Sequence, residues 1–348
     1  MTEPIRTDPG TADYKEFDQG DNRLEILLLE PIAQEVVAWL QARHSVAFRP
    51  ELALDLVALR KEAYKTRAIV FPRHTRVTRE LLDFLPKLKV IGRLIGGMDN
   101  TDLDFCKDRG IKVIYAGSSH VRSNAEYLLS NLLNLYRRTL PSAMTGSRSG
   151  AISPARELHG STVGLLGLSP VAHTLAGMLS SLGVRLIGYD PAVHHTSPVW
   201  EQLRVQPVSL VELMSRSNGV SVQMLDVARF KGFINDKLLS ACKRHQLWVG
   251  ISRRSLFDEA ALAAALTDGR IEACILDGDE SGLPAAASPL HGLKNLWLTP
   301  GLGCQTQEAN LRSCWYVAQR IASALEAQQT GTDPLLSAPV PLIARAAV

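Results

Sequence analysis

The sequence predicts an α/β protein built from two doubly wound parallel-sheet domains. Short apolar runs alternate with segments of helical periodicity along almost the whole chain, which is the pattern of βαβ units. The alternation stops at a stretch rich in Gly, Ser and Pro, residues 146–160, and then starts again. The chain has 348 residues, which is enough for two ordinary domains.

The first series of elements ends near residue 138. Its expected strands are 24–30, 67–72, 88–94 and 111–117. A helix is expected to follow the first strand and to begin at Pro31, because proline is favoured at the first helical position. Further helices are expected at 78–86 and at 123–138, where apolar residues recur at helical spacing and Ser123 is the expected N-terminal cap.

The second series begins at Thr162. Its expected strands are 162–168, 184–190, 219–225, 246–252, 272–278 and 296–300. A helix at 171–183 is expected to end at Gly183, because glycine favours the left-handed conformation that ends helices, and another helix is expected at 258–270. Two such series predict two doubly wound domains with a cleft between them.

The composition narrows the class of protein and of partner. The chain is 46% hydrophobic with a net charge of +3, which suits a soluble protein and gives no indication of nucleic acid or a membrane as partner. The five cysteines form no C-x-x-C pair, so a cytoplasmic location is expected. No segment has the pattern of a signal peptide, a membrane span or a metal site. Residues 1–22 and 331–348 are expected to lie outside the packed core.

The stretch 163–191 has the order of a dinucleotide-binding fingerprint: strand, tight turn, helix, second strand and acid. Gly167 takes the place of the first glycine, Ser169 of the second and Ala172 of the third. Asp190 follows Gly167 by 23 positions, where a carboxylate accepts hydrogen bonds from the ribose hydroxyls and repels a 2′-phosphate. The stretch therefore predicts NAD as cofactor in preference to NADP.

The turn itself leaves two interpretations open. Pro170 and Val171 begin a helix whose free N–H groups would face the phosphates, while the Ser169 side chain either crowds the pyrophosphate or bonds to it. An ordinary buried βαβ turn also needs small residues, and an Asp at a strand end is often only a turn former. This stretch alone does not decide between the two.

Three longer segments carry a more specific likeness. Residues 88–138, 250–278 and 296–309 resemble the segments of D-2-hydroxyacid dehydrogenases that carry the substrate loops, the catalytic arginine and the catalytic histidine. The resemblance implies a Rossmann NAD-binding domain at 122–302, inserted into a flavodoxin-like substrate domain formed by 23–121 and 303–330. It also implies a homodimer formed through the helix at 123–138 and the segment after it.

Several site residues carry over by position. The resemblance assigns Arg253 to the arginine that holds the substrate carboxylate and polarises the ketone. Gly96 and Gly97 match the loop whose backbone N–H groups bind that carboxylate. Ser252 and Gln223 fall on the cofactor side, and Gln223 replaces a histidine that is usual near the nicotinamide.

The family's acid–base pair does not carry over. Gly301, in the segment TPGLG, stands where the family has the catalytic histidine, and Gly282 stands where it has the glutamate that raises the pKa of that histidine. Glu280 is close enough in sequence to substitute in part. His120 replaces an asparagine that is usual in the substrate loop, and His74 lies on another loop expected at the cleft. Each of these histidines is either a substitute proton donor or an ordinary surface histidine.

Two functional hypotheses follow. In the first, the chain is an NAD-dependent oxidoreductase that interconverts a small 2-hydroxy acid and a 2-oxo acid with a degraded or relocated acid–base pair. In the second, it is a non-enzymatic, NAD-responsive scaffold or regulator, similar to the C-terminal-binding-protein and ANGUSTIFOLIA types. A glycine transfers no proton, and losing positioned acid–base catalysis costs about 10²–10⁴ in rate. Ordinary dehydrogenase turnover is therefore not expected.

Overall fold

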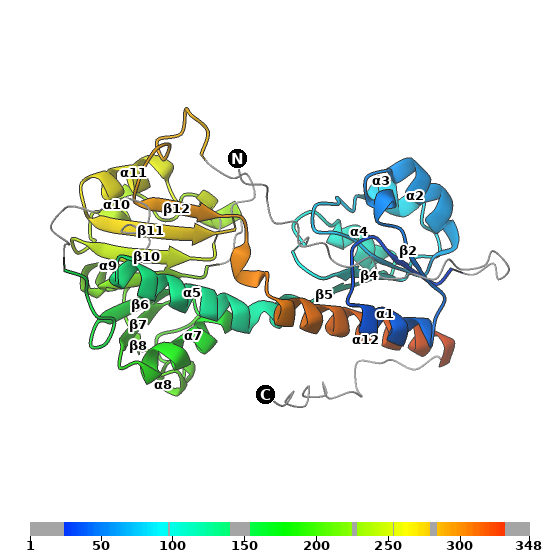
Figure 1. The fold of residues 1–348 in the computed structure, drawn as a ribbon, viewed down its shortest axis with the longest axis horizontal. Coiled ribbons are helices and arrows are strands. Elements are labelled where there is room, and N and C mark those ends of the chain that lie inside the picture. Colours follow the sequence, from blue (N-terminus) through cyan, green and yellow to red (C-terminus); the bar gives the residue numbers. More distant parts are fainter. Residues whose placement is uncertain are drawn as a thin grey trace. The chain divides into compact units, whose positions relative to one another are not determined.

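The computed structural model describes residues 24–96, 98–139, 154–224, 228–252, 254–278 and 284–330. The chain divides into two compact units, residues 1–119 with 310–348, and residues 120–309. The second unit is thus inserted into the first, as the sequence predicted. Each unit is an α/β domain (Figure 1).

The first unit contains a five-stranded parallel sheet in the order β2-β1-β3-β4-β5. This is the flavodoxin-like order 2-1-3-4-5. Its strands are β1 (Ile26–Leu28), β2 (Val46–Phe48), β3 (Ala68–Val70), β4 (Val90–Arg93) and β5 (Lys112–Tyr115).

Helices cover both faces of this sheet. One face packs on α1 (Gln34–Gln41) and α12 (Gln307–Thr330), and the other packs on α2 (Leu56–Glu62), α3 (Arg79–Asp83) and α4 (Leu103–Asp108). In β1, Ile26 and Leu28 face the first pair of helices while Leu27 faces the other three, as the alternation of side chains in a strand requires. The chain therefore returns to its first sheet through α12, which lies beside α1 in Figure 1.

The second unit contains a seven-stranded parallel sheet in the order β12-β11-β10-β9-β6-β7-β8. Read from β8, this is the Rossmann order 3-2-1-4-5-6 with one further strand. Its strands are β6 (Thr162–Leu166), β7 (Arg185–Tyr189), β8 (Gln206–Pro207), β9 (Gly219–Val222), β10 (Gln246–Gly250), β11 (Ile271–Asp277) and β12 (Leu296–Thr299).

Two helical layers enclose the second sheet. The first layer contains α5 (Val121–Tyr136) and α7 (Pro170–Ser181). The second contains α9 (Leu210–Arg216), α10 (Asp236–Leu239) and α11 (Glu259–Thr267). The short α8 (Val199–Gln202) precedes β8, and six 3₁₀ turns complete the described elements: η1 (Pro50–Ala53), η2 (Ala63–Lys65), η3 (Gly117–His120), η4 (Ala228–Phe230), η5 (Arg254–Leu256) and η6 (Leu302–Cys304).

Two predicted helix starts are wrong. The helix after β1 begins at Gln34, because the preceding residues stay extended and bury Ile32 in the core of the first unit. Ser123 does not cap α5, which begins at Val121; Ser123 is already helical, and its hydroxyl donates to the carbonyl of His120 at 3.3 Å. Serine caps a helix only from an extended conformation ahead of it.

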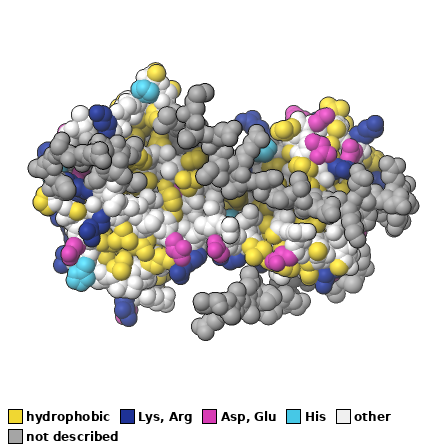
Figure 2. Space-filling model, in the orientation of Figure 1, with side chains coloured by type: hydrophobic (Ala, Val, Ile, Leu, Met, Phe, Trp, Pro, Cys, Tyr) yellow, Lys and Arg dark blue, Asp and Glu magenta, His cyan; other side chains and the backbone are white. Residues whose placement is uncertain are grey.

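Charged side chains of both signs are dispersed over the described surface that Figure 2 shows. Figure 2 shows Lys and Arg side chains as separate spots, with Asp and Glu between them, over the described surface of this face. Over the ranges that the structure describes, no helix is both long and apolar enough to cross a membrane.

Candidate cofactor site and catalytic loop

The phosphate-binding turn is built around Gly167 at the end of β6. Its φ of 95° lies in the left-handed region, and a Cβ there would come within 2.9 Å of the Met224 amide nitrogen and 3.0 Å of the Gln223 carbonyl. Glycine is therefore required at this position, both for the turn and for the close approach of the neighbouring strand end. A tight turn is the role expected of the first glycine of the fingerprint.

Ser169 occupies the second glycine position without strain. Its φ of −66° is open to any residue, and its side chain accepts a hydrogen bond from the Ala172 amide at 3.4 Å as the N-cap of α7. Pro170 follows as the first helical residue, where a missing N–H costs nothing. The hydroxyl thus has a structural task at the helix N-terminus, which also faces the loop where a phosphate would sit.

Asp190 ties the end of β7 to the same turn. One carboxylate oxygen accepts from the Leu168 amide at 2.6 Å and the other from the Ala192 amide at 2.7 Å. Asp190 therefore stabilises a turn at the end of β7, which is the structural role that the sequence left open for it. Each carboxylate oxygen has a second lone pair, so these bonds leave capacity for a ribose hydroxyl.

A pocket of about 750 Å³ opens beside Asp190. Its polar lining includes a second carboxylate, Glu212 of α9, and the exposed pair His194 and His195, whose rings lie 4.2 Å apart. This volume falls in the range of pockets that take small ligands and cofactors. Two carboxylates at one pocket oppose the entry of a further negative group.

Gln223 and Ser252 follow β9 and β10 at the same end of the sheet. Both side chains are buried, at 4% exposure each. The Gln223 amide nitrogen donates to the hydroxyl of Ser221, and the Ser252 hydroxyl donates to the Met224 carbonyl at 2.8 Å. The side-chain oxygen of Gln223 is buried and has no hydrogen-bond partner among the described residues. A buried acceptor of this kind is costly unless a ligand donates to it.

The residue that organises the loop after β12 is Asp277. Its carboxylate is 4% exposed and accepts three backbone N–H groups at 2.8 Å each, from Gly301, Leu302 and Gly303. The hydroxyl of Thr299 donates to it as well. Asp277 was not among the predicted site residues. The signal that identifies it is an acid at a strand end facing a glycine-rich turn.

Gly301 has no side chain to offer at this loop. It lies buried at φ 84° and ψ 40°, in the left-handed region, and its amide is committed to Asp277. The turn is therefore held by hydrogen bonds around one carboxylate, with no side chain from position 301. The neighbouring hydroxyl of Tyr127 bonds to that of Thr299 at 2.7 Å, and burial, together with the Asp277 charge, raises the pKa of Tyr127 to about 12. Tyr127 therefore stays protonated near neutrality and is a poor proton donor.

The two candidate histidines differ in burial. His120 ends η3, precedes α5 in the second unit and is 3% exposed. His74 belongs to the first unit and is exposed on the loop between β3 and α3. The burial of His120 is unlike that of a surface loop histidine, whereas that of His74 fits it.

In the first unit, Gly96 lies under an arginine that the sequence did not single out. The φ of Gly96 is 54°, and a Cβ there would come within 3.0 Å of Arg73 Nε and 3.1 Å of Arg73 Cγ. Asn100 fixes the arginine's backbone by donating to the Arg73 carbonyl at 2.9 Å. A cation therefore covers the loop that the resemblance assigns to carboxylate binding.

Arg93, at the end of β4, joins two loops of the first unit: the loop after β3 and the loop before α4. Its guanidinium is fully buried and donates to the carbonyls of Pro72 at 2.7 Å and Thr75 at 3.0 Å, and to the hydroxyl of Thr101 at 2.8 Å. Each loop is thus anchored to the end of β4 by charge-assisted bonds. Three further site candidates, Gly97, Arg253 and Gly282, and the nearby Glu280, lie outside the described residues.

Comparison with known proteins adds a family to this geometry. The model of the D-isomer-specific 2-hydroxyacid dehydrogenase NAD-binding domain matches residues 129–303. The (S)-sulfolactate dehydrogenase of Chromohalobacter salexigens is 30% identical over 304 residues, which cover 86% of this chain and 98% of that protein.

For another relative, the match covers about half of that protein's length. The D-3-phosphoglycerate dehydrogenase of Mycobacterium bovis is 33% identical over 262 residues, which cover 74% of this chain and 49% of that protein. Among solved structures, apo D-mandelate dehydrogenase of Rhodotorula graminis has a TM-score of 0.74 at 22% identity, covering 92% of this chain and 98% of that one. This likeness shows the shared fold.

Proposed function

This chain belongs to the D-isomer-specific 2-hydroxyacid dehydrogenase family, and we propose that it is a member in which the acid–base pair is degraded or relocated. It binds NAD and a small 2-oxo or 2-hydroxy acid, and it lacks the ordinary turnover of the family. The observation that carries the proposal is Gly301, a buried left-handed glycine that brings no side chain to the loop and whose amide donates to Asp277.

The residues that would hold the cofactor are the turn and helix start from Gly167 to Ala172, together with Asp190, Gln223 and Ser252. Two observations support the fit. A Cβ at position 167 would collide with the neighbouring strand end, so only glycine suits the turn. The buried side-chain oxygen of Gln223 has no hydrogen-bond donor among the described residues, and a bound ligand could supply one. When bound, NAD supplies a site that accepts or releases hydride. The chain's own part is to bind and orient it.

NAD is preferred over NADP in this proposal because Asp190 and Glu212 both line the neighbouring pocket. Calorimetric titration with NADH and with NADPH tests it. The expected result is binding of NADH below millimolar concentration and NADPH binding at least tenfold weaker. No heat with millimolar NADH would end the cofactor assignment, and tighter binding of NADPH would end the role given to Asp190.

Introducing a histidine at position 301 tests whether the loop lacks only a proton donor. In Gly301→His a side chain enters at φ 84°, which costs about 1–2 kcal/mol of backbone strain. Gly301→Asn is the matched control, because asparagine tolerates the same conformation and transfers no proton. We expect Gly301→His to oxidise NADH with 2-oxo acids at least tenfold faster than Gly301→Asn. Equal rates would show that proton transfer is not what this loop lacks.

If the acid–base function has been relocated, the candidate proton donor is His120, which is buried at the start of α5. If His120 supplies the proton, His120→Ala removes the residual turnover of the wild type while NADH still binds. If His120→Ala leaves that turnover unchanged, the degraded site is the correct description. A wild type that binds NADH and shows no turnover with any 2-oxo acid would favour the scaffold hypothesis.

We further infer that the substrate carries a second anionic group. Arg73 covers Gly96, and it would add a cation beside the carboxylate-binding loop. The names of the two relatives, sulfolactate and phosphoglycerate dehydrogenase, both denote a 2-hydroxy acid with a second strong acid on the same molecule. A guanidinium binds sulfonate and phosphate through paired hydrogen bonds.

Binding of 2-oxo acids with and without a second acid tests this inference. We expect sulfopyruvate to bind in the presence of NADH at least tenfold more tightly than pyruvate, and Arg73→Ala to remove that difference. Arg79→Ala is the charge-matched control, because Arg79 stacks on Phe105 instead. Equal affinities for the two oxoacids in the wild type would refute a second anion site.

A further inference from the structure

The second unit has a concave surface at the end of its sheet that the cofactor does not use. It has a volume of about 690 Å³ and lies along the first residues of β6 and β7 and the entry to β8. Gly167 and Asp190 follow the opposite ends of β6 and β7, and these five-residue strands span roughly 16 Å. The surface adjoins the pocket beside Asp190 at α9, where Arg216 lies 3.8 Å from the carboxylate of Glu212. We call this surface the arginine pocket.

The lining of the arginine pocket is basic. Three of its side chains are arginines, Arg185, Arg204 and Arg216, and no Asp or Glu is among the lining residues. The remaining polar lining residues are Thr162, Ser180 and Gln206. Arg216 faces the Glu212 carboxylate at 3.8 Å, so the positive potential of the concavity comes mainly from Arg185 and Arg204, which repel one another. An anion with more than one charge relieves that repulsion.

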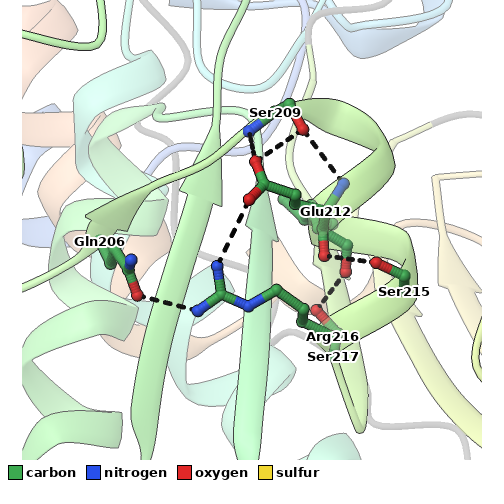
Figure 3. A network of polar contacts seen from close by, with 7 residues as sticks. Gln206, Ser209, Glu212, Ser215, Arg216 and Ser217 are labelled. Atoms are coloured by element: carbon green, nitrogen blue, oxygen red, sulfur yellow. Dashed lines mark hydrogen bonds and ion pairs between the residues drawn. The ribbon is translucent and has the colours of Figure 1, made fainter.

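The guanidinium of Arg216 is positioned by two neighbouring side chains, Gln206 and Glu212 (Figure 3). Its guanidinium donates to the side-chain oxygen of Gln206 at 3.0 Å and lies 3.8 Å from the carboxylate of Glu212. Glu212 is itself fixed in a capping box, in which it accepts from the Ser209 amide at 2.9 Å and the Ser209 hydroxyl at 2.7 Å. A cation that is already ordered loses less entropy when it binds a ligand.

The guanidinium groups of Arg185 and Arg204 make fewer hydrogen bonds and ion pairs with the described residues than that of Arg216. Arg185 makes one long hydrogen bond, from Nε to the Thr162 hydroxyl at 3.4 Å. Within the described part of the chain, the guanidinium of Arg204 makes no hydrogen bond or ion pair, and its backbone is left-handed at φ 54°. Glycine or asparagine would suit that turn better than arginine. The turn therefore does not explain the side chain.

We propose that the arginine pocket binds a small phosphate-type anion with two or more negative charges. Guanidinium groups bind such oxyanions through paired hydrogen bonds, and the pocket presents three guanidiniums to one volume. This is a site distinct from the turn at Gly167, although both lie in the second unit. It goes beyond the proposed dehydrogenase chemistry and does not depend on it.

Calorimetric titration with inorganic pyrophosphate at constant ionic strength tests the proposal. NADH is held at saturation, so that pyrophosphate cannot occupy the cofactor's own phosphate turn. We expect one site with submillimolar affinity, weakened about tenfold by Arg204→Ala or by Arg185→Ala, because each variant removes a charged hydrogen-bond donor. The control Lys237→Ala removes an exposed charge on α10 of the same unit and is expected to leave the affinity unchanged.

Three results would overturn the assignment. The first is no binding at 10 mM pyrophosphate, and the second is equal weakening by Lys237→Ala, which would mean general attraction to a basic domain. The third is binding that survives Arg185→Ala, Arg204→Ala and their combination. If the wild type does not bind NADH, the same titration is run without it, and loss of binding in Arg204→Ala still identifies this pocket. Citrate binding as tightly as pyrophosphate would refute the preference for phosphate.

Discussion

At the scale of single residues, the catalytic loop is organised by an acid that sequence comparison passes over. Asp277 collects three amides and a hydroxyl in a buried position. A buried carboxylate with that many donors is well satisfied and leaves the donors no other partner. The loop is therefore held without a side chain at position 301, and the proposed loss of a histidine there is compatible with its shape.

Glu30, just after β1, is the residue whose charge should most affect stability. Burial raises the pKa of this carboxyl from 4.5 to about 7, against the opposing effects of the Leu94 amide and the nearby charge of Arg93. A raised pKa in the folded state means that folding favours the protonated form. The free-energy cost of ionising this buried carboxyl lowers the stability of the fold. That cost is absent below about pH 4.5, grows between pH 4.5 and 7, and is complete above pH 7.

The variant Glu30→Gln should therefore gain stability as the pH rises. We expect the wild type and the variant to unfold alike near pH 4.5, and the variant to be more stable by as much as about 3 kcal/mol at pH 8. Thermal unfolding across this pH range measures the difference. Glu62→Gln, on the exposed side of α2, is the control and should show no such trend. A gain that is equal at both pH values would contradict the raised pKa.

At the scale of secondary structure, the helix after the phosphate turn depends on Ser169. Its hydroxyl caps the Ala172 amide, and loss of an N-cap serine costs about 0.5–2 kcal/mol. Because the bond is long, Ser169→Ala should destabilise the second unit by about 1 kcal/mol or less, and Ser169→Gly by only a few tenths. Chemical denaturation measures both, with Ser181→Ala at the other end of α7 as control. Stabilisation by Ser169→Ala would show that the hydroxyl is no cap.

The sequence predicted the elements with strong patterns and missed several of the short ones. The apolar runs at β4 and β6 and the long amphipathic α5 could be recognised, and Gly183 ends α7 at φ 74° as expected. Helices such as α2, α4 and α9 have seven residues or fewer, too few turns to show a period. They are set by caps and by packing on the sheet, which a pattern along one chain does not reveal.

At the scale of the whole molecule, the order of the strands and the return of α12 to the first sheet followed from the family resemblance. The site was less predictable. Arg73 over Gly96, the amides around Asp277 and the three guanidiniums of the arginine pocket each join residues far apart in the chain or depend on side-chain direction. Spacing in the sequence carries no record of such contacts.

A homodimer remains a prediction from the family resemblance. Most apolar residues of α5 pack into the core of its own unit, and Leu133 is the large hydrophobic of this helix that is clearly exposed, at 39%. Light scattering at micromolar concentration should give twice the chain mass of 38.0 kDa. A mass of one chain that persists at higher concentration would contradict it.

The most direct test of the account is the steady-state turnover of the wild type with NADH and a panel of 2-oxo acids: pyruvate, glyoxylate, hydroxypyruvate, phenylpyruvate, 2-oxoglutarate and sulfopyruvate. An ordinary enzyme turns over at about 10 s⁻¹, and loss of acid–base catalysis lowers that rate by about 10²–10⁴. With Gly301 in the loop, the account predicts NADH binding and turnover below about 0.1 s⁻¹ with every member of the panel. A rate near 10 s⁻¹ with any of them would show that the chain moves the proton efficiently without that histidine, and would contradict the central claim.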